Sequence, residues 1–188
     1  TGWGGGRAAC GAGAAGDWTD EAERVARVRG LQPAMTIAEI GAGRGELTVE
    51  IARRVPQGRV YSTEIDRARL ADIERRVQEA RLSHVTVLEA GERDSNLPDG
   101  CCDAVFMREV YHHFADPAHT TRTLHRALKP GGLLAVIDYP ARGPLFGGDC
   151  HCIAKDALIA QVTALGFEVV ADEDRWAGIR YLVVFRKR

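Results

Sequence analysis

Apolar residues recur every three or four positions in four stretches of the chain, which is the spacing of one buried helix face. These residues are Ala22, Val25 and Val28; Leu47, Ile51 and Val55; Leu70, Ile73 and Val77; and Leu158, Val162 and Leu165. Gly30 and Gly166 stand just beyond the first and last stretches, where glycine commonly ends a helix. Asp116 before Pro117 predicts the start of a fifth helix, and the Lys-Pro-Gly-Gly sequence at 129–132 predicts its end.

Short apolar runs alternate with these helices and predict strands. The predicted strands are Thr36 to Ile40, Val60 to Thr63, Val85 to Leu88, Ala104 to Met107, Leu133 to Ile137, Phe167 to Val170 and Ile179 to Phe185. Strands that alternate with helices form parallel βαβ units, with helices on both faces of one open sheet. The last two strands have only a short connection and should pair as a hairpin. The expected fold is therefore a doubly wound α/β sheet of seven strands, mostly parallel, with the last strand antiparallel.

The first seventeen residues are mostly glycine and alanine, and Trp3 is their only large apolar side chain. Such a segment buries too little surface to order itself alone. We therefore expect residues 1–17 to be a tail or a lid, with Trp3 as its anchor, and residues 18–188 to form a single domain.

Charge and cysteine content argue against some classes of binding partner and some cellular locations. The chain has 25 basic and 26 acidic side chains, so no overall field attracts nucleic acid or an anionic membrane. No apolar stretch is long enough to span a bilayer, and no secretory signal is present. Five cysteines without framework spacing are typical of a reducing compartment. These features predict a cytoplasmic protein that binds neither nucleic acid nor membrane.

Three glycines follow the first predicted strand, at Gly41, Gly43 and Gly45. Glycine lets a backbone turn tightly and approach a ligand, and the helix that follows offers unpaired N–H groups. Glu64 ends the second predicted strand, at about the distance where a carboxylate that binds ribose hydroxyls is expected. The loop and Glu64 together predict an adenosine-containing ligand.

Charge in the loop favours one such ligand. A dinucleotide site needs a third glycine where this chain has Glu46, whose carboxylate would repel a pyrophosphate. Glu39 places a second carboxylate beside the loop, where it suits an ammonium group. Adenosine joined to a cationic amino acid describes S-adenosylmethionine.

Four segments resemble those of class I S-adenosylmethionine-dependent methyltransferases, similar to small bacterial ubiquinone/menaquinone-biosynthesis-type methyltransferases. They are AEIGAGRGELT, VYSTEID, LPDGCCDAVFMREVYHHFADP and LHRALKPGGLLAVID. The resemblance covers roughly residues 19 to 138 and implies a Rossmann-like sheet. It also implies the site: Glu39, Gly41, Gly43 and Gly45 at the methionine part, Glu64 at the ribose, Ile65 on the adenine, Gly91 or Glu92 at its polar edge, and the backbone of Arg108 near the amino-acid end.

Several side chains follow the fourth and fifth strands, at the edge where a methyl group would be transferred. His112, His113 and Asp138 are the candidate catalytic residues, because a group that titrates near neutrality can take a proton from a hydroxyl or amine. The alternative is that one histidine packs under the next helix and that Asp138 caps a loop amide. Tyr111 and Tyr139 follow the same two strands and are further candidates for a general base, and Tyr139 and Phe146 are alternatively candidates for lining an apolar acceptor pocket.

Cys150-His151-Cys152 is a further cluster of potential ligands. Zinc sites usually have at least two residues between paired cysteines, and no second pair completes a tetrahedron, so no metal is expected. If the cluster is functional, it favours a soft acceptor, such as a thiol or a trivalent metalloid.

The expected function is methyl transfer from S-adenosylmethionine to a small-molecule acceptor. Two alternatives stay open: a non-catalytic S-adenosylmethionine-binding or partner-binding module with the same fold, and a nucleotide-dependent oxidoreductase. The exposed edges of the predicted sheet allow either a monomer or a homodimer.

Overall fold

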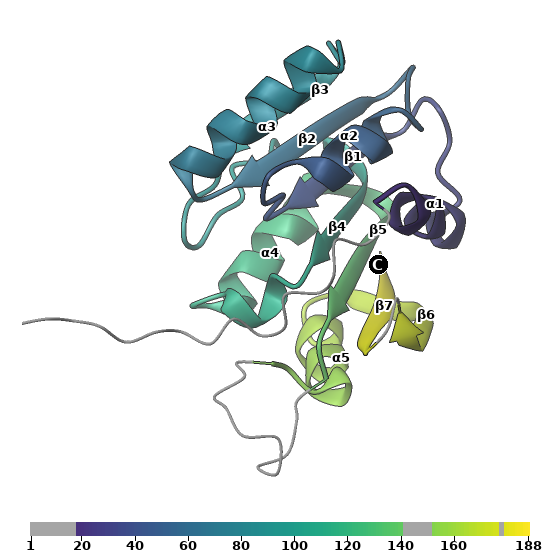
Figure 1. Cartoon of the computed structure of the whole chain (residues 1–188). Helices are drawn as coiled ribbons and strands as arrows, with labels where there is room; N and C mark the ends of the chain where they lie inside the picture. Colours follow the sequence, from purple (N-terminus) through teal and green to yellow (C-terminus); the bar gives the residue numbers. More distant parts are fainter. Residues whose placement is uncertain (1–17, 141–151, 177–178) are drawn as a thin grey trace, which may run out of the picture.

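The computed structural model describes residues 18–140, 152–176 and 179–188, and it contains one seven-stranded sheet with flanking helices (Figure 1). The helices are α1 (Trp18–Arg29), α2 (Glu46–Ala52), α3 (Arg67–Glu79), α4 (Pro117–Ala127), α5 (Lys155–Thr163) and the short 3₁₀ helix η1 (Tyr111–His113). The strands are β1 (Thr36–Ile40), β2 (Arg59–Glu64), β3 (Val85–Glu89), β4 (Cys102–Arg108), β5 (Leu128–Asp138), β6 (Phe167–Trp176) and β7 (Arg180–Lys187).

The strand order is β3-β2-β1-β4-β5-β7-β6. Strands β1 to β5 pair in parallel, whereas β7 is antiparallel to both of its neighbours, β5 and β6. The seven-stranded, doubly wound fold expected from the sequence is therefore confirmed, including its final hairpin. The chain order reverses between β1 and β4, and in open α/β sheets ligands bind at the carboxyl ends of the strands beside such a point.

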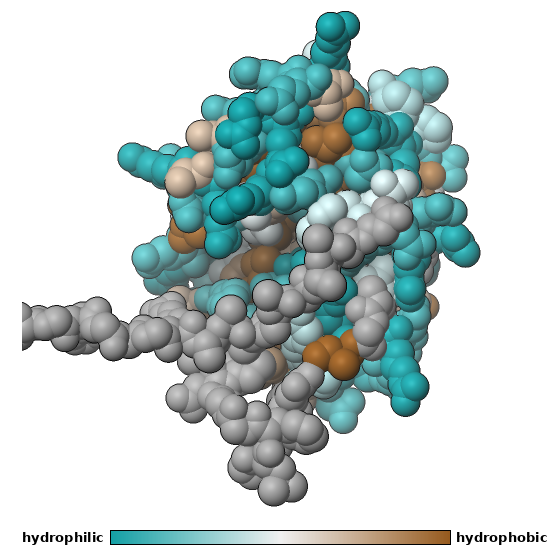
Figure 2. Space-filling view, viewed as in Figure 1, coloured by the Kyte–Doolittle hydropathy of each residue, from teal (hydrophilic) through white to brown (hydrophobic). Residues whose placement is uncertain are grey.

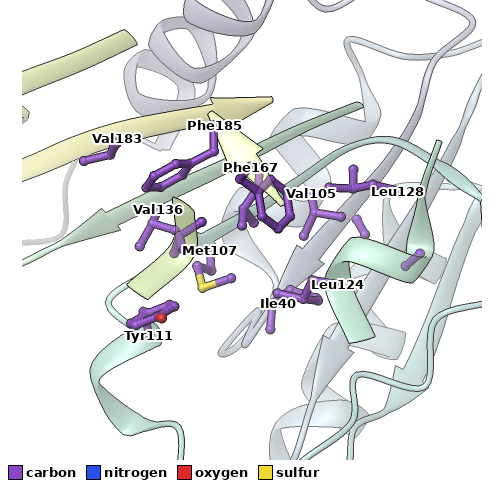
Figure 3. Packing of buried hydrophobic residues seen from close by; sticks show 14 of the residues in the cluster. Ile40, Val105, Met107, Tyr111, Leu124, Leu128, Val136, Phe167, Val183 and Phe185 are labelled. Carbon is purple, nitrogen blue, oxygen red and sulfur yellow. The ribbon is translucent and has the colours of Figure 1, made fainter. Parts of the chain in front are cut away.

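Neighbouring residues of each strand pack into opposite layers, because side chains alternate across a sheet. Ile37 and Phe106 belong to the layer that also holds residues of α1 and α2. Ala38 and Val105, the residues beside them, belong to the layer with α4 and α5. Figure 3 shows the second layer, in which Tyr111 lies near Met107 and Val136. Both faces of the sheet are thus covered, as the near-continuous apolar strands require.

Acidic residues cap the starts of two helices, and the start at Asp116 was predicted from the sequence. The Asp66 carboxylate accepts a hydrogen bond from the amide of Ala68 at the start of α3. The Asp116 carboxylate does the same for the amide of His119 at the start of α4, and Pro117 follows it. Each cap satisfies an amide that lacks a partner within its helix.

Strand β5 begins earlier than the sequence predicted. Helix α4 does end before Lys129, but the Lys-Pro-Gly-Gly segment then enters the sheet instead of forming a loop. Leu128 pairs with Cys102, and the register shifts before Leu133 pairs with Ala104. The Lys129 ammonium also binds the Asp103 carboxylate of β4 at 2.8 Å. This long-range pairing overrides the local preference of proline and glycine for a turn.

Strand β6 runs on to Trp176, beyond its predicted end at Val170. Most of its residues are exposed, so its composition does not look like that of a buried strand. Its pairing with β7 holds it in the sheet up to the pair Trp176 and Arg180. The Trp176 ring is buried beneath the guanidinium of Arg24.

The described surface in the view of Figure 2 is mostly hydrophilic, with separate apolar patches. Among the described residues, no helix combines the length and the apolar character that crossing a membrane requires. Residues 1–17, expected to be a tail or lid, lie outside the described part of the chain.

Candidate functional site

A cavity of about 440 Å³ opens at the carboxyl ends of β1, β2, β3 and β4. Its volume lies in the usual range for small-molecule sites, roughly 300–1,000 Å³. The residues expected to hold a cofactor line it, with the exception of Gly45: they are Glu39, Gly41, Gly43, Glu64, Ile65, Gly91, Glu92 and Arg108. Residues from the ends of four strands are thus brought to one cavity.

The three glycines of the loop have different roles, although all have positive φ. At Gly41, an added Cβ would lie 2.5 Å from a methyl group of Val110, so this glycine permits close packing of the loop on the segment after β4. At Gly43, an added Cβ would meet nothing within 4 Å, so the space in front of it is open. At Gly45, it would lie 3.1–3.2 Å from Ile73, so Gly45 lets α2 approach α3. Only the first two glycines line the cavity.

Glu64 is a buried carboxylate held by backbone amides. Its Oε2 accepts a hydrogen bond from the amide of Gly43 at 2.8 Å, and its Oε1 accepts from the amides of Ile65 at 2.9 Å and Asp66 at 3.2 Å. The carboxylate therefore fixes the position of the glycine loop relative to the end of β2. Ile65 beside it is 54% exposed and lines the cavity, so it offers an apolar surface to a ligand.

Glu39 lies behind the loop at the end of β1. Its carboxyl group is 4% exposed and accepts a hydrogen bond from the Thr48 hydroxyl, which in turn contacts the Ser62 hydroxyl at 2.9 Å. Burial raises the pKa of Glu39 to about 8, although the Thr48 hydrogen bond and the positive charge of Arg108 act in the opposite direction. A cation placed beside Glu39 would stabilise its charged form.

The loop after β3 closes another side of the cavity. The amide of Gly91 donates to the carbonyl of Asp94 at 2.7 Å, which folds the loop back on itself. Asp94 and Ser95 line the cavity together with Gly91 and Glu92 and were missed from the sequence. The signal that could have identified this turn is Asn96, which has a φ of 57° and follows an Asp-Ser pair.

The side chain of Arg108 has a larger role than the sequence indicated. Its guanidinium binds Glu21 of α1 at 2.9 Å and Glu109 at 3.1 Å, and it lies 5.0 Å from the ring centre of Trp18. Trp18 and Arg108 both line the cavity. Helix α1 therefore supplies part of the wall, through contacts between residues far apart in the sequence.

The candidate catalytic residues separate into two environments. The Nδ1 atom of His112 lies 2.6 Å from Oδ1 of Asp138, and their side chains are 4% and 0% exposed. Asp138 Oδ1 also accepts a hydrogen bond from the amide of Tyr139 at 2.7 Å. Neither His112 nor Asp138 lines the cavity, whereas His113 does, and the two histidine rings lie 4.0 Å apart. His112 and Asp138 therefore support His113 instead of facing the cavity.

The hydroxyls of Tyr111, a candidate base, and Tyr139, a candidate base or acceptor-pocket residue, bind other side chains. The Tyr111 hydroxyl donates to Gln161 of α5 at 3.1 Å, and the Tyr139 hydroxyl donates to Glu109 at 3.2 Å. Burial raises the pKa of both phenols, so both remain donors at neutral pH. Neither ring lines the cavity. Phe146 lies outside the described residues.

Cys150 and His151 of the predicted cysteine cluster also lie outside the described residues. In the part of the chain that the structure describes, no group of three metal-ligating side chains converges. The sulfur atoms of Cys101 and Cys102 lie 2.8 Å apart at the amino end of β4. The cavity lies at the other end of this strand. Burial raises the pKa of both thiols, which makes them poor nucleophiles.

Glu109 is a cavity-lining residue that the sequence did not reveal. It follows β4 directly and has a φ of 59°, a conformation that is rare for residues other than glycine. No local sequence pattern marks it, because its hydrogen-bond donors come from β7 and from the residue after β5.

A comparison with protein-family models matches residues 38–136 to the methyltransferase domain. This match covers more than half of the chain and includes the loop, Glu64 and the segment after β4. The chain belongs to this methyltransferase family.

Curated relatives carry related names. The chain is 36% identical over 104 residues to a demethylmenaquinone methyltransferase from Thermus thermophilus, which covers 55% of this chain and 47% of the relative. It is 29% identical over 112 residues to a 2-phytyl-1,4-naphtoquinone methyltransferase from Trichormus variabilis, covering 58% and 49%. The chain thus spans about half the length of the curated relatives it matches.

Solved structures share the fold. A SAM-dependent methyltransferase from Aquifex aeolicus superposes with a TM-score of 0.81 at 22% identity, covering 89% of each chain. The [4+2]-cyclase SpnF superposes with a TM-score of 0.78 at 20% identity, covering 90% of this chain and 80% of the other. At these identities the likeness concerns the fold, which is shared by proteins named for different reactions.

Proposed function

We propose that this protein transfers a methyl group from S-adenosylmethionine to a small-molecule acceptor. The observation that carries the proposal is the hydrogen bond between the Gly43 amide and Glu64, which faces the open space in front of Gly43. A ligand that contains a ribose would meet the Glu64 carboxylate there, and the part of the ligand attached to the ribose would meet the accessible backbone at Gly43. The residues present therefore fit this cofactor.

In this proposal each part of the cofactor has its own residues. Glu64 accepts hydrogen bonds from the ribose hydroxyls, and Ile65 packs on the adenine, whose polar edge faces Gly91 or Glu92. The amino-acid part lies along the loop near Glu39, with the backbone of Arg108 beside it. Gly45 supports the loop from behind through its packing on Ile73.

S-adenosylmethionine supplies a methyl group on a positively charged sulfur. Transfer forms one bond from the acceptor atom to the methyl carbon and breaks the bond from that carbon to sulfur, so an acceptor that carries a proton must lose it. His113 lines the cavity and is the residue we assign to receive that proton. The buried pair of His112 and Asp138 positions it from behind. Trp18 and Val110 contribute apolar side chains to the wall around the reacting groups.

The acceptor is proposed to be an aromatic small molecule of the quinone class. The names of the curated relatives support this class, and apolar side chains of Trp18, Val110 and Phe114 line the cavity. Residues 18–188 are proposed to act as a single domain, as a monomer or a homodimer.

One alternative is that this chain binds S-adenosylmethionine without transferring its methyl group, and the fold is indeed shared by a protein named for a different reaction, a cyclase. The deciding experiment incubates the protein with S-adenosylmethionine and a panel of aromatic acceptors and measures S-adenosylhomocysteine by mass spectrometry. Formation of S-adenosylhomocysteine with a methylated acceptor supports the proposal. Calorimetric binding without any product favours the non-catalytic module instead.

Binding of NADH in place of S-adenosylmethionine would overturn the cofactor assignment and favour an oxidoreductase. Glu46 lines the cavity where a dinucleotide site needs glycine, so we expect calorimetry to detect S-adenosylmethionine and not NADH.

A further inference from the structure

Glu109 is held in a fixed position at the end of the cavity next to β4. Its amide donates to the carbonyl of Ile137 in β5 at 2.7 Å, and its φ of 59° turns the chain directly after the strand. A left-handed conformation is unfavourable for a residue with a side chain, and such residues concentrate at functional sites. This cost is offset by contacts of the side chain.

Those contacts use one oxygen of the carboxylate. Oε1 accepts hydrogen bonds from Arg180 at 2.9 Å and from the Tyr139 hydroxyl at 3.2 Å, and it forms an ion pair with Arg108 at 3.1 Å. The three partners come from β7, from the residue after β5 and from β4. They fix the orientation of the carboxylate, and none of them uses Oε2.

Both arginines also contact Glu21 of α1, Arg108 at 2.9 Å and Arg180 at 3.5 Å. The cluster therefore contains two acidic and two basic side chains. Glu21 is 5% exposed and does not line the cavity, whereas Glu109 does. Within this balanced cluster, Glu109 is the carboxylate that a ligand in the cavity can reach.

The position of Glu109 separates it from the proposed adenosine site. Glu64 ends β2 and Glu109 follows β4, and β1 with its glycine loop lies between these two strands. Val110, the next residue, packs against Gly41 of the loop. Glu109 thus lies on the far side of the loop from Glu64, and it lines the same cavity as His113.

We propose that Glu109 binds the methyl acceptor and selects acceptors that carry a hydroxyl or amine, through a hydrogen bond to Oε2. This inference rests on the proposed function and assigns the substrate class of the same site. Hydrogen bonds to a charged partner contribute about 1.5–3 kcal/mol, which corresponds to roughly tenfold to a hundredfold in affinity. The preference should therefore be measurable with simple aromatic probes that suit the apolar wall.

The experiment measures the affinities of 1-naphthol, 1-naphthylamine and 1-methoxynaphthalene by equilibrium dialysis, with and without saturating S-adenosylhomocysteine. The first two probes carry a donor and the third does not. We expect wild type to bind at least one donor probe about tenfold more tightly than the methoxy compound. Comparison of the affinities for 1-naphthol and 1-naphthylamine shows whether the site prefers a hydroxyl or an amine donor.

Glu109→Gln should remove most of this preference, because the amide oxygen carries no charge. Glu21→Gln is the matched control, since it takes a carboxylate from the same two arginines outside the cavity; it should keep the preference. Because Glu109 lies apart from the proposed adenosine site, the affinity for S-adenosylhomocysteine should change by less than about threefold in Glu109→Gln. Such a change is small beside the effect of a charged hydrogen bond.

Equal binding of all three probes by wild type would overturn the inference, as would a preference that survives Glu109→Gln or falls equally in Glu21→Gln. Failure of wild type to bind S-adenosylhomocysteine would instead count against the proposed function. The dialysis without that compound still tests Glu109 in this case.

Discussion

The amide of Gly43 donates a hydrogen bond to the Glu64 carboxylate at 2.8 Å, although 21 positions separate the two residues in the chain. One residue belongs to the loop after β1 and the other to the end of β2, and these strands pair in parallel. The contact joins the two parts of the proposed cofactor site before any ligand binds. A ligand therefore meets a site whose geometry is already largely set.

Replacement of Glu64 should weaken S-adenosylmethionine binding strongly. Glu64→Ala removes the proposed ribose partner and leaves the Gly43 amide without its acceptor, so we expect a loss of at least about tenfold in affinity by calorimetry. Glu89→Ala is a suitable control, because Glu89 ends the neighbouring strand β3, is half-exposed and does not line the cavity. Equal effects of the two changes would contradict the assignment of Glu64.

The glycines of the loop should respond differently to alanine. Gly41→Ala forces a Cβ to 2.5 Å from Val110, so the melting temperature should fall clearly. Gly43→Ala meets nothing within 4 Å, so it should cost only about 1 kcal/mol of backbone strain while filling the space in front of the loop. We expect Gly43→Ala to remain folded and to lose S-adenosylmethionine affinity. Undiminished affinity in folded Gly43→Ala would show that the ligand lies elsewhere.

Binding of S-adenosylmethionine should strengthen as pH rises toward 8. The pKa of Glu39 is raised to about 8 by burial, so this group is mostly protonated at pH 7 in the free protein. An ammonium group beside it favours the charged form, so binding releases a proton. The expected gain is at most tenfold per pH unit between pH 6 and 8, and it levels off above pH 8.

Calorimetry in buffers with different ionisation enthalpies measures this proton release directly. Glu39→Gln cannot release a proton, so its affinity should be lower and nearly independent of pH over this range. A pH dependence that persists unchanged in Glu39→Gln would assign the titration to another group.

Changes at His113 and at Asp138, the partner of His112, should have separable effects on turnover and on stability. His113→Ala should lower the turnover rate by about a hundredfold if a proton must leave the acceptor, while melting temperature and cofactor affinity change little. Asp138→Asn should instead lower the free energy of unfolding, because a buried carboxylate with two hydrogen-bonded partners is changed. Urea denaturation and steady-state kinetics on the same samples separate the two effects. A stable His113→Ala variant with full activity would remove His113 from the reaction.

The order of helices and strands followed from the sequence because apolar periodicity and capping residues act locally. Asp66 and Asp116 each meet an amide within three residues, so their roles are encoded in short segments. The link between the glycine loop and Glu64 was also predictable, because successive parallel strands place their carboxyl ends side by side.

Contacts between distant residues were decided by the tertiary structure. Glu109 meets Arg180 from 71 positions away, and Arg108 meets Glu21 from 87 positions away, and no local spacing signals either pair. The same reason explains why adjacent His112 and His113 differ. The turn of η1 sends one ring to the buried Asp138 and the other to the cavity, a choice set by packing against β5 and not by residue type.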